Sequence, residues 1–213
     1  MTELIKTQNT EGESSIYRNS DSFEFAQRQA KSLCTSTLVP PSYQGQEGLP
    51  NCLVALEMSK RMNLSPLTVM QNLNVIHGRP SWSAQFITSI IIGCDRFKNF
   101  DYVVEGSGES LSVQCTAIRL EDNKLVKGTA VTMKMARSEG WTKNPKYTSM
   151  PDLMLRNRAA TFFGRQYIPD LLLGVQTSEE VIDIEPEPIN VSESPDFREQ
   201  KKPKQEDNDD NQF

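Results

Sequence analysis

Hydrophobic residues recur at helical spacing in five segments of the chain. In each segment an apolar residue returns every three or four positions, as on an α-helix that buries one face. Asn51 precedes one segment as an expected N-cap, and Gly93 follows another as an expected stop. The expected helices span 22–36, 52–63, 66–73, 84–92 and 152–167.

The region between the last two helices follows a different pattern. It alternates apolar with polar residues or is rich in β-branched residues, which is typical of strands. The expected strands span 101–105, 111–120 and 125–136, and a short strand with a tight turn is expected over 75–82. Because successive strands joined by short turns pair antiparallel, the sequence predicts an α+β fold: an antiparallel three-stranded meander packed by helices.

The two ends of the chain lack such patterns. Residues 1–22 are polar, and 177–213 are acidic and contain several prolines, so neither end has the apolar residues of a core. We therefore expect a disordered N-terminal segment (1–22), one DNA-binding and oligomerisation domain (23–176) and an acidic disordered tail (177–213). No run approaches the roughly 18 to 20 apolar residues of a membrane span, so no membrane partner is predicted.

The four cysteines lie far apart, and His77 is the only histidine. Structural zinc needs four clustered ligands, so the sequence predicts free thiols in a reducing cytoplasm and no metal site. His77 precedes Gly78, which is typical of a turn residue.

Charge is unevenly spread. The formal net charge is −5, yet residues 175–213 hold twelve acidic and four basic residues, which leaves +3 on 1–174. Within that part, residues 119–174 hold ten basic and five acidic residues. A basic half thus precedes the acidic tail, a distribution that favours an acidic partner such as a nucleic acid.

The expected helix 152–167 carries Arg156, Arg158 and Arg165 on an otherwise apolar and aromatic segment. On a helical wheel Arg158 and Arg165 share one flank and Arg156 lies on the other. Guanidinium groups bind phosphates with paired donors, so the segment indicates a nucleic-acid backbone site. A core helix whose arginines reach solvent or pair with the tail would have the same composition. The residues expected to face the core are Leu155, Ala159, Phe162 and Phe163.

Two basic segments precede this helix. The loop 138–149 interleaves aromatic rings with lysines, a combination that suits stacked bases and a phosphate backbone. A surface loop pinned by Trp141 against the sheet and an ordinary polar strand face are the alternatives. The candidate DNA-binding residues are Trp141, Lys143 and Lys146 in the loop, and Lys127, Lys134 and Arg137 along the third strand.

Motifs of catalysis are few. The sequence has no GxxxxGK[ST], GxSxG or HExxH motif, so we expect no enzyme and no ATP dependence. Asp122-Asn123-Lys124 has the Asp-x-Lys spacing of some metal-dependent nucleases, but no Pro-Asp precedes it and it falls in an expected turn. A metal-dependent nuclease and a non-catalytic interaction protein with structural arginines are the alternative functions.

Three blocks of the sequence carry a family pattern: NLSPLTVMQNLNVIHGRPSWS (63–83), ARSEGWTKNPKYTSMPDLMLRNRAATFFGR (136–165) and YIPDLLLG (167–174). They resemble the RecT/Redβ-type phage single-strand annealing proteins over roughly residues 50–178. The resemblance implies a β-β-β-α core, assembly into rings or filaments, and arginines at 156, 158 and 165 that face the DNA backbone. Some relatives have a lysine where this chain has Asp152, which leaves Lys143 and Lys146 as possible substitutes.

The expected function is therefore ATP-independent binding and annealing of single-stranded DNA in phage or prophage recombination, in the bacterial cytoplasm. The expected partners are single strands, the annealed duplex and further copies of the chain. No cofactor is predicted, and any help from Mg²⁺ would need no protein site. The tail ends in QEDNDDNQF, similar to the acidic tip of bacterial single-stranded-DNA-binding proteins. It could occupy the basic groove, bind host proteins or a phage exonuclease, or only solubilise the chain.

Overall fold

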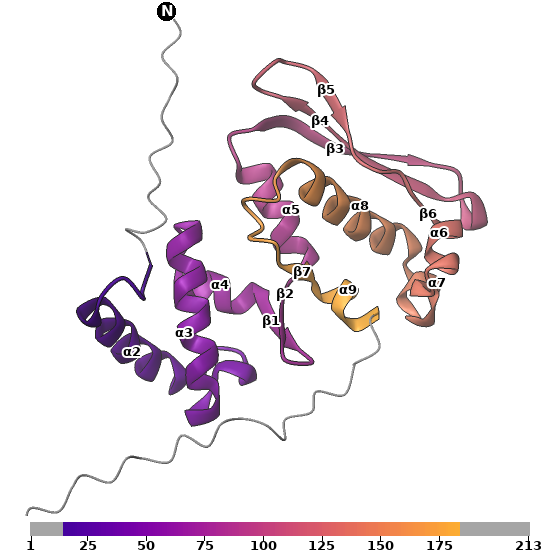
Figure 1. Ribbon diagram of the computed structural model, residues 1–213. Helices are drawn as coiled ribbons and strands as arrows, with labels where there is room; N and C mark the ends of the chain where they lie inside the picture. Colours follow the sequence, from indigo (N-terminus) through magenta and orange to yellow (C-terminus); the bar gives the residue numbers. More distant parts are fainter. Residues whose placement is uncertain (1–14, 184–213) are drawn as a thin grey trace, which may run out of the picture.

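Helices and strands are mixed along the described part of the chain, residues 15–183 of a computed structural model (Figure 1). This mixture confirms the predicted α+β class. The elements are α2 (Ser20–Cys34), η1 (Pro41–Tyr43), α3 (Gly45–Met62), α4 (Pro66–Asn72), β1 (Leu73–Ile76), β2 (Arg79–Trp82), α5 (Ala84–Gly93), β3 (Phe97–Glu105), η2 (Gly108–Ser110), β4 (Ser112–Arg119), β5 (Leu125–Lys127), β6 (Val131–Thr132), α6 (Met133–Ser138), η3 (Trp141–Lys143), α7 (Lys146–Ser149), α8 (Pro151–Tyr167), β7 (Gln176–Thr177) and α9 (Ser178–Asp183).

The larger sheet is built around β4, which pairs antiparallel with β3, β5 and β6. The predicted single strand over 125–136 is wrong, because β5 and β6 are separated and α6 follows at once. A Cβ on Gly128 would lie 3.2 Å from the Phe163 ring, so the chain passes close over α8 between the two strands. Thr132 then caps α6 by accepting a hydrogen bond from the Met135 amide at 3.1 Å. Lys134 and Arg137 therefore lie on a helix.

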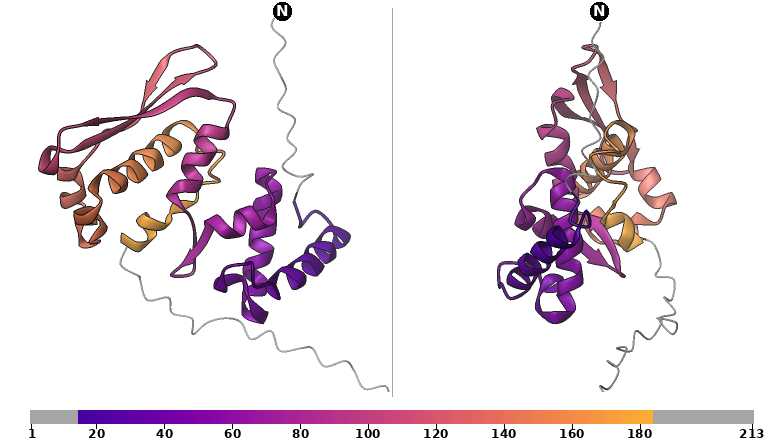
Figure 2. Two further views of the ribbon diagram at one scale, coloured as in Figure 1. Left: turned by 180° about the vertical axis from the view of Figure 1, so that it is seen from behind. Right: turned by 60° about the vertical axis from the view of Figure 1, so that its left-hand side comes forward.

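Helices α5 and α8 cover one face of this sheet, as the views from two sides show (Figures 1 and 2). The alternation in β4 explains the contact, because Val113, Cys115 and Ala117 are all fully buried. The predicted core face of α8 is confirmed: Leu155, Ala159 and Phe163 are fully buried, and Phe162 is partly buried.

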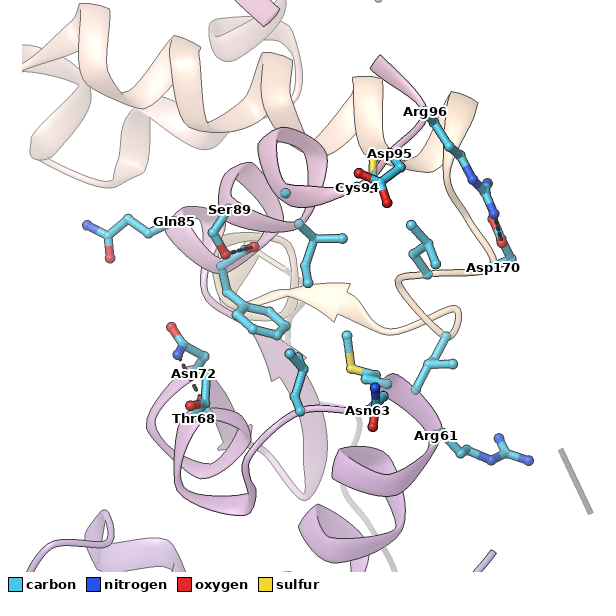
Figure 3. Close-up of a pocket in the computed structure, with 17 residues that line it drawn as sticks. Arg61, Asn63, Thr68, Asn72, Gln85, Ser89, Cys94, Asp95, Arg96 and Asp170 are labelled. Atoms are coloured by element: carbon cyan, nitrogen blue, oxygen red, sulfur yellow. Dashed lines mark hydrogen bonds and ion pairs between the residues drawn. The ribbon is translucent and has the colours of Figure 1, made fainter. Parts of the chain in front are cut away.

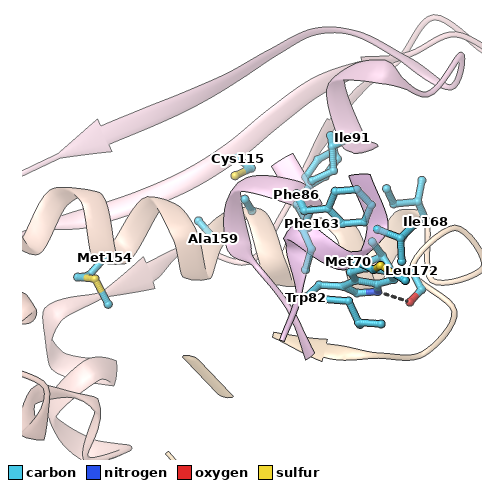
Figure 4. Packing of buried hydrophobic residues seen from close by; sticks show 14 of the residues in the cluster. Met70, Trp82, Phe86, Ile91, Cys115, Met154, Ala159, Phe163, Ile168 and Leu172 are labelled. Carbon is cyan, nitrogen blue, oxygen red and sulfur yellow. Dashed lines mark hydrogen bonds between the residues drawn. The ribbon is translucent and has the colours of Figure 1, made fainter. Parts of the chain in front are cut away.

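A smaller sheet contains β1, β2 and β7 and lies near the end of α8. The predicted tight turn is confirmed, since His77 (φ 50°) and Gly78 (φ 72°) both adopt the left-handed conformation between β1 and β2. Trp82 at the end of β2 is fully buried, and its indole Nε1 donates to the Leu172 carbonyl at 3.1 Å (Figure 4). This bond ties the chain after α8 to the hairpin.

Two predicted boundaries of the ordered domain are wrong. The Ile16 side chain is fully buried, and its amide donates to Glu57 of α3 at 2.8 Å, so order begins before residue 22. At the other end β7 pairs parallel with β2, and Val181 of α9 is 2% exposed. Residues 177–183 are therefore part of the fold, whereas 1–14 and 184–213 lie outside the described residues.

Helices α2, α3 and α4 pack together on the side of the molecule away from the larger sheet (Figure 1). Helix α3 begins at Gly45 rather than at the predicted residue 52. Asn51 does not cap it, because its side chain donates to the Ser42 carbonyl at 2.7 Å. Within residues 15–183, no helix is long and apolar enough to cross a membrane.

All four cysteines are free thiols, as predicted. Burial raises the pKa of the Cys52 thiol to about 11 and that of Cys115 to about 12. Both therefore stay protonated at neutral pH and behave as small apolar core residues.

Gly48 is required where α3 crosses η1, because a Cβ there would lie 2.2 Å from the Tyr43 carbonyl carbon. We expect Gly48→Ala to lower the free energy of unfolding by about 1–3 kcal/mol through overpacking against backbone. Urea denaturation measures this loss. Gly93→Ala is the matched control, since a Cβ at Gly93 has no neighbour within 4 Å. Equal midpoints for the two variants would contradict the close packing of α3 on η1.

Candidate nucleic-acid interface

Four exposed basic residues lie at the end of the molecule where α8 begins. Lys134 and Arg137 are on α6, Lys143 is on η3 and Lys146 is on α7, and both α6 and α7 contact η3 (Figure 1). We call these four residues the basic corner. Tight turns bring the elements together, because Gly140 (φ 73°) separates α6 from η3 and Pro145 precedes α7.

The lysines of the basic corner differ from its arginine in their partners. Arg137 forms an ion pair with Glu109 of η2. Within residues 15–183, no carboxylate lies within 4 Å of the ammonium groups of Lys134, Lys143 or Lys146. An anionic ligand could therefore contact these lysines without first breaking such an ion pair.

Arg158 is buried, with 3% of its surface exposed. Its guanidinium carbon lies 4.3 Å from the centroid of the Trp141 ring, and its Nε donates to the Tyr147 hydroxyl at 3.2 Å. Trp141 and Tyr147 are themselves buried. The expectation that Arg158 and Trp141 face a DNA strand is thus wrong for this structure. The cation–π contact joins η3 to α8, and the hydrogen bond to Tyr147 joins α7 to α8.

Arg156 lies on the opposite flank of α8, as predicted, and contacts the larger sheet. Its Nε bonds the Asp152 carboxylate at 2.8 Å, one helical turn away, and its guanidinium carbon lies 5.1 Å from the Tyr102 ring centroid. Burial raises the pKa of the Tyr102 hydroxyl. About a third of the Arg156 side chain is exposed, so the residue is a partly available cation beside β3.

Arg165 is on the last turn of α8, far from the basic corner. It follows Pro151 by fourteen residues, which corresponds to about 20 Å along a helix. Its Nη2 bonds the Glu180 carboxylate of α9 at 2.6 Å. Lys127 lies elsewhere again, exposed on β5 opposite Thr116. The predicted DNA-binding residues therefore do not converge on one groove.

Glu180 is not among the site residues predicted from the sequence, although the sequence contains the spacing of a helix-capping motif at this residue. Thr177 and Glu180 form a capping box, in which the Glu180 carboxylate accepts from the Thr177 amide at 3.0 Å and the Glu180 amide donates to Thr177 Oγ1 at 3.4 Å. A threonine three residues before a glutamate is the usual mark of a helix start. The acidic composition of the segment obscured it.

The Asp-x-Lys motif lies in the turn between β4 and β5, as predicted. Asp122 pairs with Arg119 at 2.7 Å and with Lys124 at 3.3 Å. Hydrogen bonds from Arg119, and then from Lys124, hold the pKa of the Asp122 carboxyl well below its usual range. Across residues 15–183, no group of three or more His, Cys, Asp or Glu side chains could hold a metal ion.

A groove of about 980 Å³ lies between α5 and the helices α3 and α4 (Figure 3). Apolar residues such as Leu64, Phe86 and Ile90 share its lining with polar ones. At its rim Arg96 donates to both oxygens of Asp170, at 2.8 and 2.5 Å, and thereby lowers the pKa of that carboxyl. Within the described part of the chain, none of the predicted DNA-binding residues lines this groove.

Comparisons with protein-family models, with curated proteins and with solved structures found no match for this chain. The resemblance to the RecT/Redβ-type proteins therefore rests on the three sequence blocks, and it stays a prediction.

Proposed function

We propose that the protein binds single-stranded DNA at the basic corner and pairs complementary strands without ATP. The observation that carries the proposal is the set of exposed lysines at 134, 143 and 146, which have no carboxylate partner within residues 15–183. Exposed lysines without a carboxylate partner attract a phosphate backbone and release its counterions on binding. The sequence blocks that resemble annealing proteins include two of these lysines, Lys143 and Lys146.

The chemistry of this function needs only non-covalent steps. Lysines would neutralise the backbone of one strand while its bases stay open to a complementary strand, and base pairing supplies the free energy. We further propose that β3, β4 and β5 with α8 correspond to the β-β-β-α core of the annealing proteins. Several copies would then align along a strand as a ring or filament in the bacterial cytoplasm.

One observation favours a second candidate, an interaction protein with structural arginines. Arg158, which the resemblance assigns to the DNA backbone, is buried against Trp141. The basic corner would then serve another acidic partner, such as an acidic protein surface. The two candidates differ in whether single strands are paired.

An annealing assay tests the proposal. Two complementary labelled strands are mixed with the protein in the absence of ATP, and the rate of duplex formation is measured together with particle size. We expect faster annealing than without protein, and particles larger than one chain. Adding Mg²⁺ and finding cleaved strands would instead identify a nuclease. No strand binding at low salt would leave the interaction protein as the better candidate.

A further inference from the structure

Helix α9 is held to the molecule by few contacts. Strand β7, which leads into it, pairs with β2 at only two positions. The Ser178 hydroxyl donates to the Trp82 carbonyl at 3.3 Å and accepts from Asn74 Nδ2 at 2.9 Å. Val181 is buried, whereas Ile182 is 58% exposed. A six-residue helix is not stable alone, so α9 depends on these contacts and would open when they are lost.

The carboxylate of Glu180 joins α9 to α8. It accepts hydrogen bonds from Arg165 at 2.6 Å, from the Thr177 amide at 3.0 Å and from the Thr177 hydroxyl at 2.9 Å. The Glu180 side chain is 11% exposed and that of Arg165 is 41% exposed. One carboxylate thus caps its own helix and also occupies an arginine that the family resemblance assigns to the DNA backbone.

We propose that α9 is a displaceable acidic clasp, in which the Glu180 carboxylate holds Arg165 until a phosphate of a bound strand replaces it. The inference rests on the proposed function. It is chemically consistent, because carboxylates and phosphates bind the same donors of a guanidinium group. It also gives Arg165, although it lies far from the basic corner, a contact with the same DNA strand once the clasp has opened.

The charge of the following segment favours opening in the presence of DNA. Residues 184–213 contain nine acidic and four basic residues. The phosphates of a DNA strand bound at Arg165 would repel this acidic segment. The segment is covalently continuous with α9. The repulsion and the loss of the Arg165 contact act in the same direction, toward release of the clasp.

The test compares Glu180→Gln with Glu121→Gln, which removes the same charge from an exposed residue in the turn between β4 and β5 and leaves the contact with Arg165 intact. At low salt we expect Glu180→Gln to raise affinity for a single strand roughly two- to fivefold, the range of a partly exposed ion pair. For this variant, the slope of log affinity against log salt concentration should become steeper by about 0.7, because Arg165 then neutralises one more phosphate. Adding Arg165→Gln should remove both gains. Equal affinities and slopes for the two glutamate variants would overturn the clasp.

A second measurement separates failure of the clasp from failure of the proposed function. Hydrogen exchange of the amides in β7 and α9 is followed in the native chain with and without a single strand. Faster exchange in the complex is expected, and unchanged or slower exchange in a complex that does form would overturn the clasp. If the native chain binds no strand, the proposed function itself fails. In that case faster exchange in Glu180→Gln without DNA would confirm only that Glu180 holds α9 in place.

Discussion

Phe163→Ala is expected to lower the free energy of unfolding by about 3–5 kcal/mol. The ring is fully buried and lies at the centre of an aromatic cluster, with ring centroids 5.3 Å from Phe97, 5.5 Å from Phe100 and 4.7 Å from Tyr167. Its removal leaves a cavity between α8 and the larger sheet. The close approach of Gly128 fixes the chain above it, so the site cannot collapse easily.

Urea denaturation measures this loss, and Phe25→Ala serves as the control. Phe25 is on α2 and is 50% exposed, so its truncation removes the same atoms from a site already in contact with water. We expect a change below about 1 kcal/mol for the control. Comparable losses in the two variants would show that α8 does not form the centre of the core.

Replacing Lys134, Lys143 and Lys146 together by glutamine is expected to weaken binding to a single strand roughly 100-fold at about 0.1 M salt. The estimate assumes that each lysine neutralises one phosphate, so the dependence of log affinity on log salt falls by about 2. Folding should be little affected, because all three side chains are exposed. Fluorescence anisotropy of a labelled strand over a salt series measures both quantities.

The matched control replaces Lys31, Lys98 and Arg79 by glutamine. These residues are also exposed and have no carboxylate partner within residues 15–183, and they lie on α2, β3 and β2, away from the basic corner. The change in net charge is the same. If both triple variants lose equal affinity and slope, attraction to DNA depends on overall charge, and the basic corner is not the site.

The sequence predicted α8 almost to the residue, because the recurrence of its apolar residues at helical spacing is a local signal. It misplaced the end of the third strand, because Met133, Lys134 and Met135 alternate as in a strand, whereas Thr132 caps a helix that begins at Met133. The break between β5 and β6 has a cause that is not local, since Gly128 there passes close over Phe163 of α8. Helix α9 was not predicted, because its capping box stands in an acidic segment without the apolar residues of a core, and the contacts that hold it come from β2 and Arg165, both distant in sequence.

For the candidate site, the sequence indicated the kinds of residue that suit a nucleic acid, but not which of those residues lie at the surface. Arginine next to aromatic rings suits binding to a nucleic acid. The same two residue types can instead form a cation–π contact inside the protein, as Arg158 and Trp141 do. Sequence alone does not distinguish these outcomes, because burial of Arg158 depends on how the loop 138–149 folds over α8. The lysines are different, since their strong hydration keeps them at the surface in most folds.

The stacking of Arg158 on Trp141 has an optical consequence. The chain has two tryptophans, and the other, Trp82, is buried beside Leu172 at the smaller sheet. A Trp82→Phe variant would therefore carry a single indole, situated beneath the lysines of the basic corner and in contact with a cation. The emission of that indole depends on the charge and solvent around it, so it would report directly any rearrangement of the corner, with no label attached.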